Sequence, residues 1–375
     1  MTGEVRRAGS CNALIDVTGL RVGHHTAIGD GYLTGTTVIL APPGGMVAGV
    51  DVRGGGPATH ETDLLDPTAS VQRIHALVLT GGSAFGLVTC AGVTNELADR
   101  HIGLQVGPGA GEVVPLVPGA AMFDLGRGGD FRARPTADFG VAALAAAEQA
   151  GPARPGEAPD GAAQGCIGAG TGAVASNLKG GIGTASEVLA GSVTVAALAA
   201  VNAAGSPVDP RTGSLLGAGL LLAADGPRPP VPDEAARQAL LRVTAPRPPG
   251  LRFTDAADAG PATDPRTITN TTLVVVATDA TLTKAQCQKM AAVAQNGMAR
   301  ALNPVHTMFD GDIVFGLATS TAGPPDLLGF HQITTAAADV VTRAIVRAVL
   351  SASTTSSPGG HWPSWADVVA GTSPA

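Results

Sequence analysis

The stretch TITNTTLVVVATD, residues 267–279, decides the fold because it contains the most strand-like run in the chain. Within it, TTLVVVAT (271–278) is rich in β-branched and apolar residues, a composition typical of a buried strand. The polar step Asn270-Thr271-Thr272 stands at the start of this run, and a long proline-rich segment lies before it. The pattern predicts a central core strand with an amide and two hydroxyl groups at its mouth.

Strand-like and helix-like segments alternate on both sides of this run. Short apolar runs bounded by glycine-rich turns predict further strands at 36–41, 46–52, 75–80, 192–202, 215–226 and 312–319. Apolar periodicity and helix-end signals predict helices at 83–98, 136–151, 283–302 and around 341–349. The polar segment 353–360 is expected to fray. Because strands and helices interleave without an internal repeat, we expect an α/β protein.

A proline-rich segment, 227–266, separates two parts of the chain. It holds PRPPVP, PRPPG and DAADAGPATDP with one short helical patch between them, and it is longer than connections in compact domains usually are. We therefore expect a linker that ends just before Asn270. It divides the chain into an N-terminal part, 1–270, and a C-terminal part, 271–375, which together form one domain.

Composition and charge exclude several classes of protein. The chain has 375 residues, of which 45% are hydrophobic and 14% charged, so it has ample apolar chain for a packed core. A formal net charge of −7 and scattered Lys and Arg give no basic patch for nucleic acid, which is not expected as a partner. No run approaches the ~20 apolar residues of a membrane span, and the first residues lack a signal-peptide pattern. We therefore expect a soluble cytoplasmic protein with no membrane partner.

The cysteine and histidine residues predict neither a metal centre nor a disulfide framework. The four cysteines, Cys11, Cys90, Cys166 and Cys287, are far apart in sequence, and no CxxC or HExxH pattern occurs. His306 is expected to be a packed or surface residue. Neither a metal nor another cofactor is therefore expected.

A threonine at the start of a chain carries its own base. Its hydroxyl lies close to a free α-amine with a pKa of about 8, which can accept the hydroxyl proton while the oxygen attacks a carbonyl. In an uncut chain, the Thr271 hydroxyl can attack the carbonyl of Asn270 instead, and water then cleaves the resulting ester. A flexible linker before this step and a rigid strand after it favour such a reaction. A turn followed by two β-favouring threonines explains the same tripeptide.

Several motifs, taken in order, resemble those of one enzyme family. They are VDVRGGGP, LTGGSAFGL, GCIGAGTG, KGGIGTAS, NTTLVVVATDATLTKAQ and HTMFDGDIVFGLAT. Each is weak alone, but their order and spacing over residues 20–350 resemble the self-processing N-terminal-nucleophile family that includes D-aminopeptidases, β-aminopeptidases and nylon-oligomer endohydrolases. The resemblance implies an α-β-β-α sandwich of the aminopeptidase and ornithine acetyltransferase type. It also implies an autoprocessed hydrolase that acts on amides of amino-acyl groups, such as peptides, β-peptides or ω-amino acid oligomers.

The resemblance implies roles for individual residues. Thr271 matches the nucleophile and new N-terminus, so the cut falls between Asn270 and Thr271. Lys179 in KGGIGTAS matches a lysine that hydrogen-bonds near the nucleophile, with a surface lysine in a glycine loop as the alternative. Asn202 in AAVNAAG matches the amide donor of the oxyanion hole, a role worth roughly a few kcal/mol. Its alternative is a turn residue at the end of a strand.

Asp310 and Asp312 in FDGD match a pair of side chains in the same family. At i and i+2 on a strand they face the same side, so their repulsion favours a cation beside them, such as a substrate ammonium or the new amine of Thr271. Nylon-oligomer hydrolases share the Asp-x-Asp pattern, whereas the better-known aminopeptidases have Ser-x-Glu. This favours ω-amino or unusual amides as substrates, and a turn with two solvated aspartates is the alternative.

Four further residues are expected to line the substrate site. Relatives often have a tyrosine as second oxyanion donor in a segment resembling VPGAAMFDL, where this chain has Phe123, which cannot donate a hydrogen bond. The second donor is therefore expected to be a backbone N–H or a water, and the turn around Gly168 and Gly170 is one candidate. Ser83 is expected to cap a helix whose N-terminus holds a substrate carboxylate.

Other functions stay open at the level of sequence. GAGTGA (168–173) fits a dinucleotide-binding pattern without a convincing strand before it, and LTGGSAFG fails as a nucleophile elbow because Phe85 replaces the second glycine. An acyltransferase similar to ornithine acetyltransferases and a non-catalytic binding protein on this scaffold are the alternatives to the hydrolase. By resemblance we expect a homo-oligomer, a tetramer of processed pairs, acting on a small-molecule or peptide-like amide.

Overall fold

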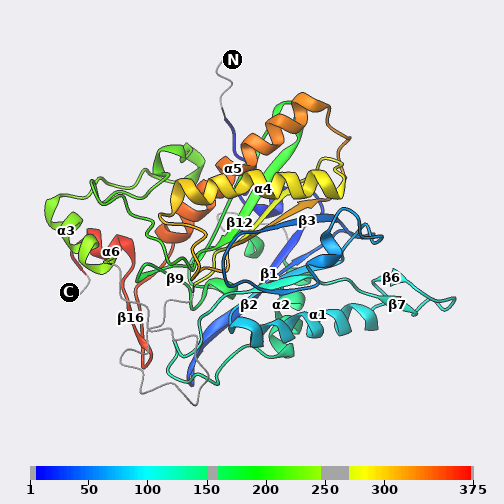
Figure 1. Cartoon of the computed structure of the whole chain (residues 1–375), viewed down its shortest axis with the longest axis horizontal. Coiled ribbons are helices and arrows are strands. Elements are labelled where there is room, and N and C mark those ends of the chain that lie inside the picture. The colour runs from blue at the N-terminus through cyan, green and yellow to red at the C-terminus, as the bar shows by residue number, and fades with distance from the viewer. Residues whose placement is uncertain (1–5, 151–158, 246–269, 373–375) are drawn as a thin grey trace.

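The computed structural model describes residues 6–150, 159–245 and 270–372. In this part of the chain two five-stranded sheets lie face to face, and helices cover the outer side of each (Figure 1). Helices α4 and α5 lie over one sheet, and α1 and α2 lie over the other. The arrangement is an α-β-β-α sandwich, which confirms the predicted fold class.

The first sheet has the strand order β1-β2-β5-β8-β4. β1 and β2 form a long antiparallel hairpin, β5 pairs antiparallel with β2, and β8 pairs parallel with β5. Val38 and Val78 on its outer face pack against Val93 of α1 and Leu144 of α2. The elements are β1 (Arg21–Gly29), β2 (Tyr32–Leu40), β4 (Ala58–His60), β5 (Ala76–Thr80), β8 (Gly119–Ala121), α1 (Val88–Asp99) and α2 (Ala137–Gln149).

The second sheet has the strand order β11-β12-β13-β14-β3, with β13 at its centre. β13 pairs antiparallel with β12 and parallel with β14, and β14 pairs antiparallel with β3. Met290 of α4 and Val341 of α5 belong to the core cluster on its outer side. The elements are β3 (Val47–Val52), β11 (Ile182–Val188), β12 (Thr194–Ala200), β13 (Leu273–Thr278), β14 (Ile313–Ala318), α4 (Lys284–Ala301) and α5 (Leu327–Leu350).

A third core cluster fills the space between the sheets. Ile39 and Leu79 of the first sheet meet Val275 and Phe315 of the second, and all four side chains are fully buried. Burial of apolar surface at ~25 cal/mol per Å² makes this layer a main source of stability. β13 contributes to both sides of its sheet, because Val274 and Val276 face the helices while Val275 faces the other sheet. This explains why its sequence is continuously apolar rather than alternating.

Smaller elements surround the sandwich. The β6–β7 hairpin projects from the body on the side away from α3 and α6 (Figure 1). The elements are β6 (Leu104–Gln105), β7 (Val113–Val114), β9 (Val174–Ala175), β10 (Leu178–Lys179), α3 (Glu234–Val243), β15 (Thr355–Ser357), β16 (Gly360–Trp362) and α6 (Trp365–Val369). The 3-10 turns are η1 (Leu14–Asp16), η2 (Asp63–Leu65), η3 (Ser83–Leu87), η4 (Asp160–Ala162), η5 (Gly168–Gly170), η6 (Ala190–Ser192), η7 (Ala218–Leu220) and η8 (Ala223–Asp225).

Most predicted elements are confirmed, but three predictions are wrong. The segment 215–226 forms two 3-10 turns instead of a strand, because Gly217 and Gly226 adopt positive φ angles of 76° and 103° that interrupt an extended run. The segment 353–360 does not fray; it enters the β15–β16 hairpin, which leads to the buried Trp365. Ser83 caps no helix: it is the first residue of η3, with φ 52°, and the N-cap residues of η3 and α1 are Gly82 and Leu87.

The linker predicted at 227–266 is only partly described. α3 lies within it and accounts for the expected helical patch, while residues 246–269 lie outside the described residues. The strands β1 and β11 were not predicted. β1 has a mixed burial pattern with two histidines, which hides its strand character, and β11 was seen only as part of a glycine motif.

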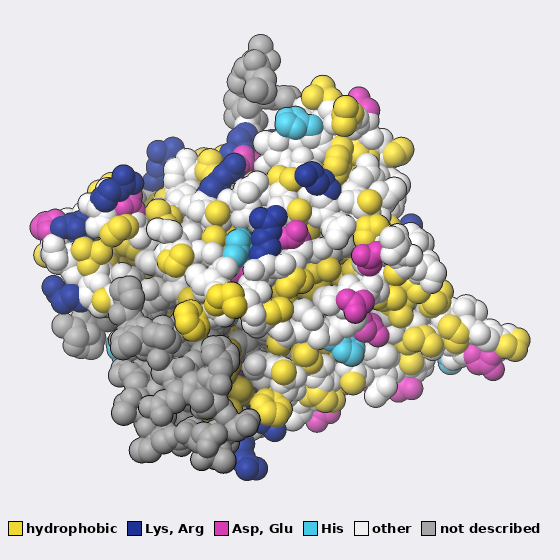
Figure 2. Space-filling model, viewed as in Figure 1, with side chains coloured by type: hydrophobic (Ala, Val, Ile, Leu, Met, Phe, Trp, Pro, Cys, Tyr) yellow, Lys and Arg dark blue, Asp and Glu magenta, His cyan; other side chains and the backbone are white. Residues whose placement is uncertain are grey.

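The surface carries no single dominant feature on the face shown in Figure 2. Lys and Arg side chains lie there in small separate groups between apolar and acidic ones. Of the described helices, none is both long enough and apolar enough to cross a membrane.

Candidate active site

The ends of four strands and the segments next to them meet at one edge of the second sheet. Because β12 runs antiparallel to β13, the residues after β12 lie beside those before β13, and Ala200 pairs with Leu273. The parallel partner β14 places the residues before it at the same edge, and Ile313 pairs with Leu273. β3, antiparallel to β14, ends there too, since Val52 pairs with Ile313. The sheet topology thus brings together segments that are far apart in sequence.

Thr271 lies at the centre of this edge. Its side chain is buried, with the residue 4% exposed. The Oγ1 hydroxyl donates to the carbonyl oxygen of Asn270 at 2.6 Å, and the backbone N–H of Thr271 donates to the carbonyl oxygen of Asn202 at 2.6 Å. The hydroxyl is therefore adjacent to the peptide group that precedes it.

A backbone N–H from the FDGD segment also binds the Asn270 carbonyl. Gly311 N–H donates to this oxygen at 2.9 Å, and Asn270 forms a parallel bridge with Asp310. A donor at this distance polarises a carbonyl and stabilises negative charge that develops on its oxygen. Gly311 thus supplies a backbone donor of the kind expected from the absence of a tyrosine at 123, but from a different segment than the predicted turn.

Only glycine fits at position 311. A Cβ there would lie 2.6 Å from Thr271 Oγ1 and 2.7 Å from the carbonyl oxygen of Gly56. The glycine run after β3 supports the same segment, since Gly56 N–H donates to the Asp310 carbonyl oxygen at 2.9 Å and Gly54 N–H to that of Asp312 at 3.2 Å. The sequence motif VDVRGGGP therefore serves as the backbone support of FDGD.

Both predicted aspartates are buried, and both oxygens of each carboxylate accept at least one hydrogen bond. Asp312 Oδ1 accepts from the Thr272 N–H at 2.9 Å, and its Oδ2 accepts from the backbone N–H of His306 at 3.0 Å and lies 3.0 Å from His306 Nδ1. Asp310 accepts from Ala204 N–H at 2.9 Å and from the Thr307 hydroxyl at 2.6 Å. The two carboxylates thus accept hydrogen bonds from the segment after β12 and from the segments before β13 and β14. They hold these three segments together beside Thr271.

The environment of Asp310 raises the pKa of its carboxyl group. Burial, and after it the nearby carboxylate of Asp312, raises the pKa of Asp310 above its ordinary value, while hydrogen bonds from Thr307 and Ala204 oppose the shift. The residue placed against Asp312 is His306, whose side chain is 18% exposed. The sequence treated His306 as a packed or surface residue, and only its position six residues before Asp312 could have indicated this contact.

The side chain of Asn202 is fully buried and held in one orientation. Its Oδ1 accepts from Arg127 Nη1 at 2.5 Å and from Val174 N–H at 3.0 Å, and its Nδ2 donates to the Phe123 carbonyl oxygen at 3.2 Å. Two donors on one side and an acceptor on the other fix which end of the amide is nitrogen. An amide nitrogen carries two protons, so Nδ2 keeps one beyond the bond to Phe123.

Lys179 is buried and bonded to backbone. Its Nζ donates to the carbonyl oxygens of Ala173 at 2.9 Å, Gly180 at 2.8 Å and Gly170 at 3.3 Å. Burial lowers the pKa of Lys179 to about 8. The surface alternative is therefore wrong. The hydrogen-bond partners of Lys179 are carbonyls of the loop that also positions Asn202 through Val174, so Lys179 acts on the site through this loop.

The four predicted substrate-lining residues have different roles in the structure. Phe123 contributes its backbone carbonyl to Asn202, as described above. The N–H groups of Gly168 and Gly170 already donate to Thr26 Oγ1 at 2.8 Å and to the Ile167 carbonyl oxygen at 2.8 Å, so this turn offers neither as an oxyanion donor. Ser83 donates its backbone N–H to the Met122 carbonyl oxygen at 2.9 Å, which places it beside β8 on the same side of the first sheet.

Arg127 was missed by the sequence analysis. It is half-buried and joins three parts of the site, because its guanidinium donates to Gly172 O at 2.5 Å, to Asn202 Oδ1 at 2.5 Å and, from Nη2, to Asn270 Oδ1 at 3.5 Å. Burial lowers the pKa of Arg127 to about 10, against the opposing charge of Asp124. An arginine in a glycine-rich loop carries no sequence signal for such a position.

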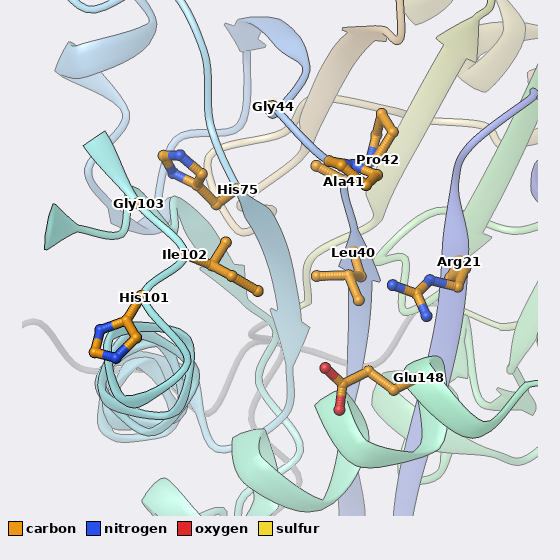
Figure 3. A pocket seen from close by; sticks show the side chains of 11 residues that line it. Arg21, Leu40, Ala41, Pro42, Gly44, His75, His101, Ile102, Gly103 and Glu148 are labelled. Atoms are coloured by element: carbon orange, nitrogen blue, oxygen red, sulfur yellow. The ribbon is translucent and has the colours of Figure 1, made fainter. Parts of the chain in front are cut away.

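A separate cavity of about 290 Å³ lies at the opposite end of the first sheet (Figure 3). Here the side chains of Arg21 and Glu148 both lie near Leu40, and those of His75 and His101 lie on the other side of Leu40, at the left of the view. The cavity lies where β5 begins, whereas Phe123 and Arg127 follow the end of the parallel strand β8. Its lining residues are Arg21, Leu40, Ala41, Pro42, Pro43, Gly44, His75, His101, Ile102, Gly103 and Glu148.

Within residues 6–150, 159–245 and 270–372, no cluster of three or more His, Cys, Asp or Glu side chains is suited to a metal ion.

Comparison with known proteins identifies the family. The model of Peptidase family S58 matches residues 12–362 of the chain. The chain belongs to peptidase family S58. It is 41% identical over 362 residues to an uncharacterized aminopeptidase of Mycobacterium leprae, with 92% of each chain covered. It is 31% identical over 336 residues to a 6-aminohexanoate-oligomer endohydrolase of a Kocuria species, covering 87% of this chain and 80% of the relative.

Solved structures show the same fold. A β-aminopeptidase of a Burkholderia species superposes with a TM-score of 0.69 at 24% identity, covering 99% of this chain and 97% of that one. The L-aminopeptidase D-Ala-esterase/amidase of Ochrobactrum anthropi, described as a variant of the Ntn hydrolase fold, superposes with a TM-score of 0.67 at 21% identity, covering 96% and 93%. Membership of family S58 confirms the predicted resemblance and makes this chain a hydrolase of amide bonds.

Proposed function

We propose that this family S58 hydrolase cuts its own chain between Asn270 and Thr271 and then uses Thr271 as an N-terminal nucleophile. The observation that carries the proposal is the contact at this peptide bond. Thr271 Oγ1 lies 2.6 Å from the Asn270 carbonyl oxygen, and Gly311 N–H donates to the same oxygen. The hydroxyl therefore lies beside the peptide group that it is proposed to attack, and the Gly311 N–H polarises the carbonyl of that group.

Self-cleavage proceeds in two steps. Thr271 Oγ1 loses its proton and attacks the carbonyl carbon of Asn270, the C–N bond breaks, and the nitrogen of Thr271 takes a proton and becomes a free amine. The acyl group is then held on Oγ1 as an ester. Water hydrolyses this ester, which releases the carboxylate of Asn270 and restores the hydroxyl of Thr271.

Turnover repeats this chemistry on an external amide. The α-amine of Thr271 accepts the Oγ1 proton as the oxygen attacks, and it returns a proton to the leaving amine. Gly311 N–H and the second Nδ2 proton of Asn202 stabilise the oxyanion. Hydrolysis of the acyl-enzyme by water completes the cycle.

The buried charged residues serve this nucleophile. Asp312, which accepts from the Thr272 N–H, and Asp310 orient the amine of Thr271 and the amine of the substrate's acyl group. Lys179 holds the loop of Ala173 and Gly180 that positions Asn202. Lys179 is thus a positioning residue in this proposal.

The two fragments, 1–270 and 271–375, stay together after the cut and form one catalytic domain. β13 and β14 belong to the C-terminal fragment, whereas their outer neighbours β12 and β3 belong to the N-terminal fragment. Each boundary is a continuous ladder, from Val195–Thr278 to Ala200–Leu273 and from Val47–Ala318 to Val52–Ile313. Separation would break both ladders and expose the core on each side of the sheet.

The proposed substrates are amides whose acyl group carries a free amine, including ω-amino acid oligomers. Support comes from relatives named as 6-aminohexanoate-oligomer endohydrolases and from the Asp-x-Asp pattern at 310–312. A tetramer of processed pairs, a cytoplasmic location and the lack of nucleic-acid and membrane partners rest on the sequence and the resemblance, and they stay predictions.

Replacement of neighbouring hydroxyls tests the proposal. Thr271→Val removes the hydroxyl and keeps the shape, so we expect one uncut band on a denaturing gel and no hydrolysis of an aminoacyl p-nitroanilide. Thr272→Val is the matched control, because Thr272 Oγ1 is buried without a hydrogen-bond partner among the described residues; this variant is expected to be cut and active. Cleavage of the Thr271→Val chain would refute the nucleophile.

A further inference from the structure

A cationic side chain contacts the residue that precedes the proposed cut. Arg127 Nη2 donates to Asn270 Oδ1 at 3.5 Å, while Nη1 is held by Gly172 O and Asn202 Oδ1, both at 2.5 Å. One end of the guanidinium is thus fixed by the protein. The other end faces the side chain of Asn270.

The protein holds Arg127 in this place from several directions. Its carbonyl oxygen accepts from the Ser357 hydroxyl in the β15–β16 hairpin. The opposing charge is Asp124, whose carboxylate is buried and accepts from Thr34 Oγ1 at 2.6 Å and from Gly82 N–H at 2.7 Å. Burial lowers the pKa of Arg127 only to about 10, so the guanidinium is protonated at neutral pH. The site therefore contains a fixed positive charge.

In self-cleavage, Asn270 is the first acyl group that Thr271 receives. The acyl group of an external substrate must occupy the same position, because its carbonyl carbon has to reach the same Oγ1 and its oxygen the same Gly311 N–H. When Asn270 leaves, Arg127 Nη2 loses its acceptor. A half-buried N–H without a partner is unfavourable, so a substrate that supplies a new acceptor is favoured.

We propose that Arg127 selects among α-aminoacyl groups by their side chains, favouring amides of residues with a hydrogen-bond acceptor on the γ carbon, such as asparaginyl and aspartyl groups, over those with a cationic side chain. This inference rests on the proposed function, since it uses the position of Asn270 to place the substrate. A lysyl or ornithyl side chain brings a second positive charge toward the guanidinium, and like charges in a partly buried site repel. Asparaginyl and aspartyl groups return the lost hydrogen bond.

Cleavage of Asn270 variants tests the proposal with Arg127 intact. We compare the rates at which Asn270→Asp, Asn270→Met and Asn270→Lys chains are cut after synthesis in a cell-free system. The aspartate variant is expected to be cut at a rate similar to that of the native chain, the methionine variant more slowly, and the lysine variant about tenfold more slowly than methionine, which has a similar length. A lysine variant cut as fast as the methionine variant would overturn the selection by charge.

Substrate preference of the mature enzyme tests the same residue directly. The ratio of kcat/KM for asparaginyl to lysyl p-nitroanilide is expected to fall about tenfold or more in Arg127→Gln, whereas Arg132→Gln, which removes an exposed arginine nearby, leaves the ratio as in the native enzyme. An unchanged ratio in Arg127→Gln contradicts the proposal. If that variant is not cut or does not fold, the Asn270 series decides.

The native chain separates this inference from the proposed function. Self-cleavage and hydrolysis of alanyl p-nitroanilide by the native protein test only the nucleophile. A native chain that is cut and hydrolyses the alanyl amide, but does not discriminate asparaginyl from lysyl groups, refutes the role of Arg127 alone. A native chain that is never cut refutes the proposed function.

Discussion

The strand ends around Thr271 and the cavity between Arg21 and His101 have opposite characters. The cavity is a hollow of about 290 Å³ lined mostly by exposed and half-buried residues (Figure 3). The Thr271 region is closed, because its own chain fills it: Asn270 bonds Gly311, Phe309 and Arg127. In an uncut chain, the proposed reaction site is occupied by Asn270, the residue that precedes the proposed cut. The shape of the surface alone would therefore indicate the cavity near Arg21, whereas the hydrogen bonds indicate Thr271, the proposed nucleophile.

The largest effect is expected for a substitution at Gly311, which would disturb the hydrogen bonds that close the Thr271 region. In Gly311→Ala the new Cβ would lie 2.6 Å from Thr271 Oγ1, so the hydroxyl and the Gly311 N–H lose their alignment on the Asn270 carbonyl. We expect self-cleavage to slow by about 100-fold or more, as for loss of an oxyanion donor, measured as the uncut fraction on a gel over time. Gly219→Ala is the control, because a Cβ there meets nothing within 4 Å. Normal cleavage of Gly311→Ala would show that this donor is not needed.

Loss of Lys179 would test how closed the Thr271 region is, through the pH dependence of the protein's stability. The pKa of Lys179 is lowered from 10.5 to about 8 in the folded protein. Between these two values the unfolded chain binds more protons, so stability rises with pH across this window. Lys179→Met should remove up to about 3 kcal/mol of this pH dependence, measured by urea unfolding between pH 8 and pH 10. A variant with the same slope as the native protein would show that Lys179 is not buried as described.

Substitutions in the cavity should have the smallest effect. Glu148 pairs with Arg100 at a partly exposed position, and such pairs contribute about 0–1 kcal/mol. We expect Glu148→Ala to keep self-cleavage and amide hydrolysis within about twofold of the native rates and to change stability by no more than this amount. A loss of hydrolysis comparable to that of Gly311→Ala would mean that the cavity takes part in the reaction.

The family resemblance predicted the sandwich, whereas the local sequence pattern predicted β13. The run LVVVAT is apolar on both faces, and this is what a central strand between a sheet and a helix layer requires. It failed at 215–226, where Leu215 and Leu221 are buried but glycines at 217 and 226 turn the chain. The apolar residues of this segment correctly indicated that it is buried. The backbone conformation at the two glycines determines that it forms 3-10 turns and not a strand.

The site was predictable only where a side chain carries a known role. Thr271, Asn202, Asp310 and Asp312 were named from motifs, and the structure places all four at one sheet edge. Gly311 was not predicted because it contributes a backbone N–H. Nearly every residue type has this group, so it gives no signal in the sequence. Arg127 and His306 were missed because their partners, Asn202 and Asp312, come from the meeting of separate segments.

Intact-mass measurement of the purified native protein shows whether the chain is cut before Thr271. We expect two chains whose masses add up to that of the full sequence plus one water, the smaller one beginning at Thr271. For Thr271→Val we expect a single full-length mass. A single full-length mass from a native preparation that hydrolyses aminoacyl amides would show that Thr271 does not act as an N-terminal nucleophile.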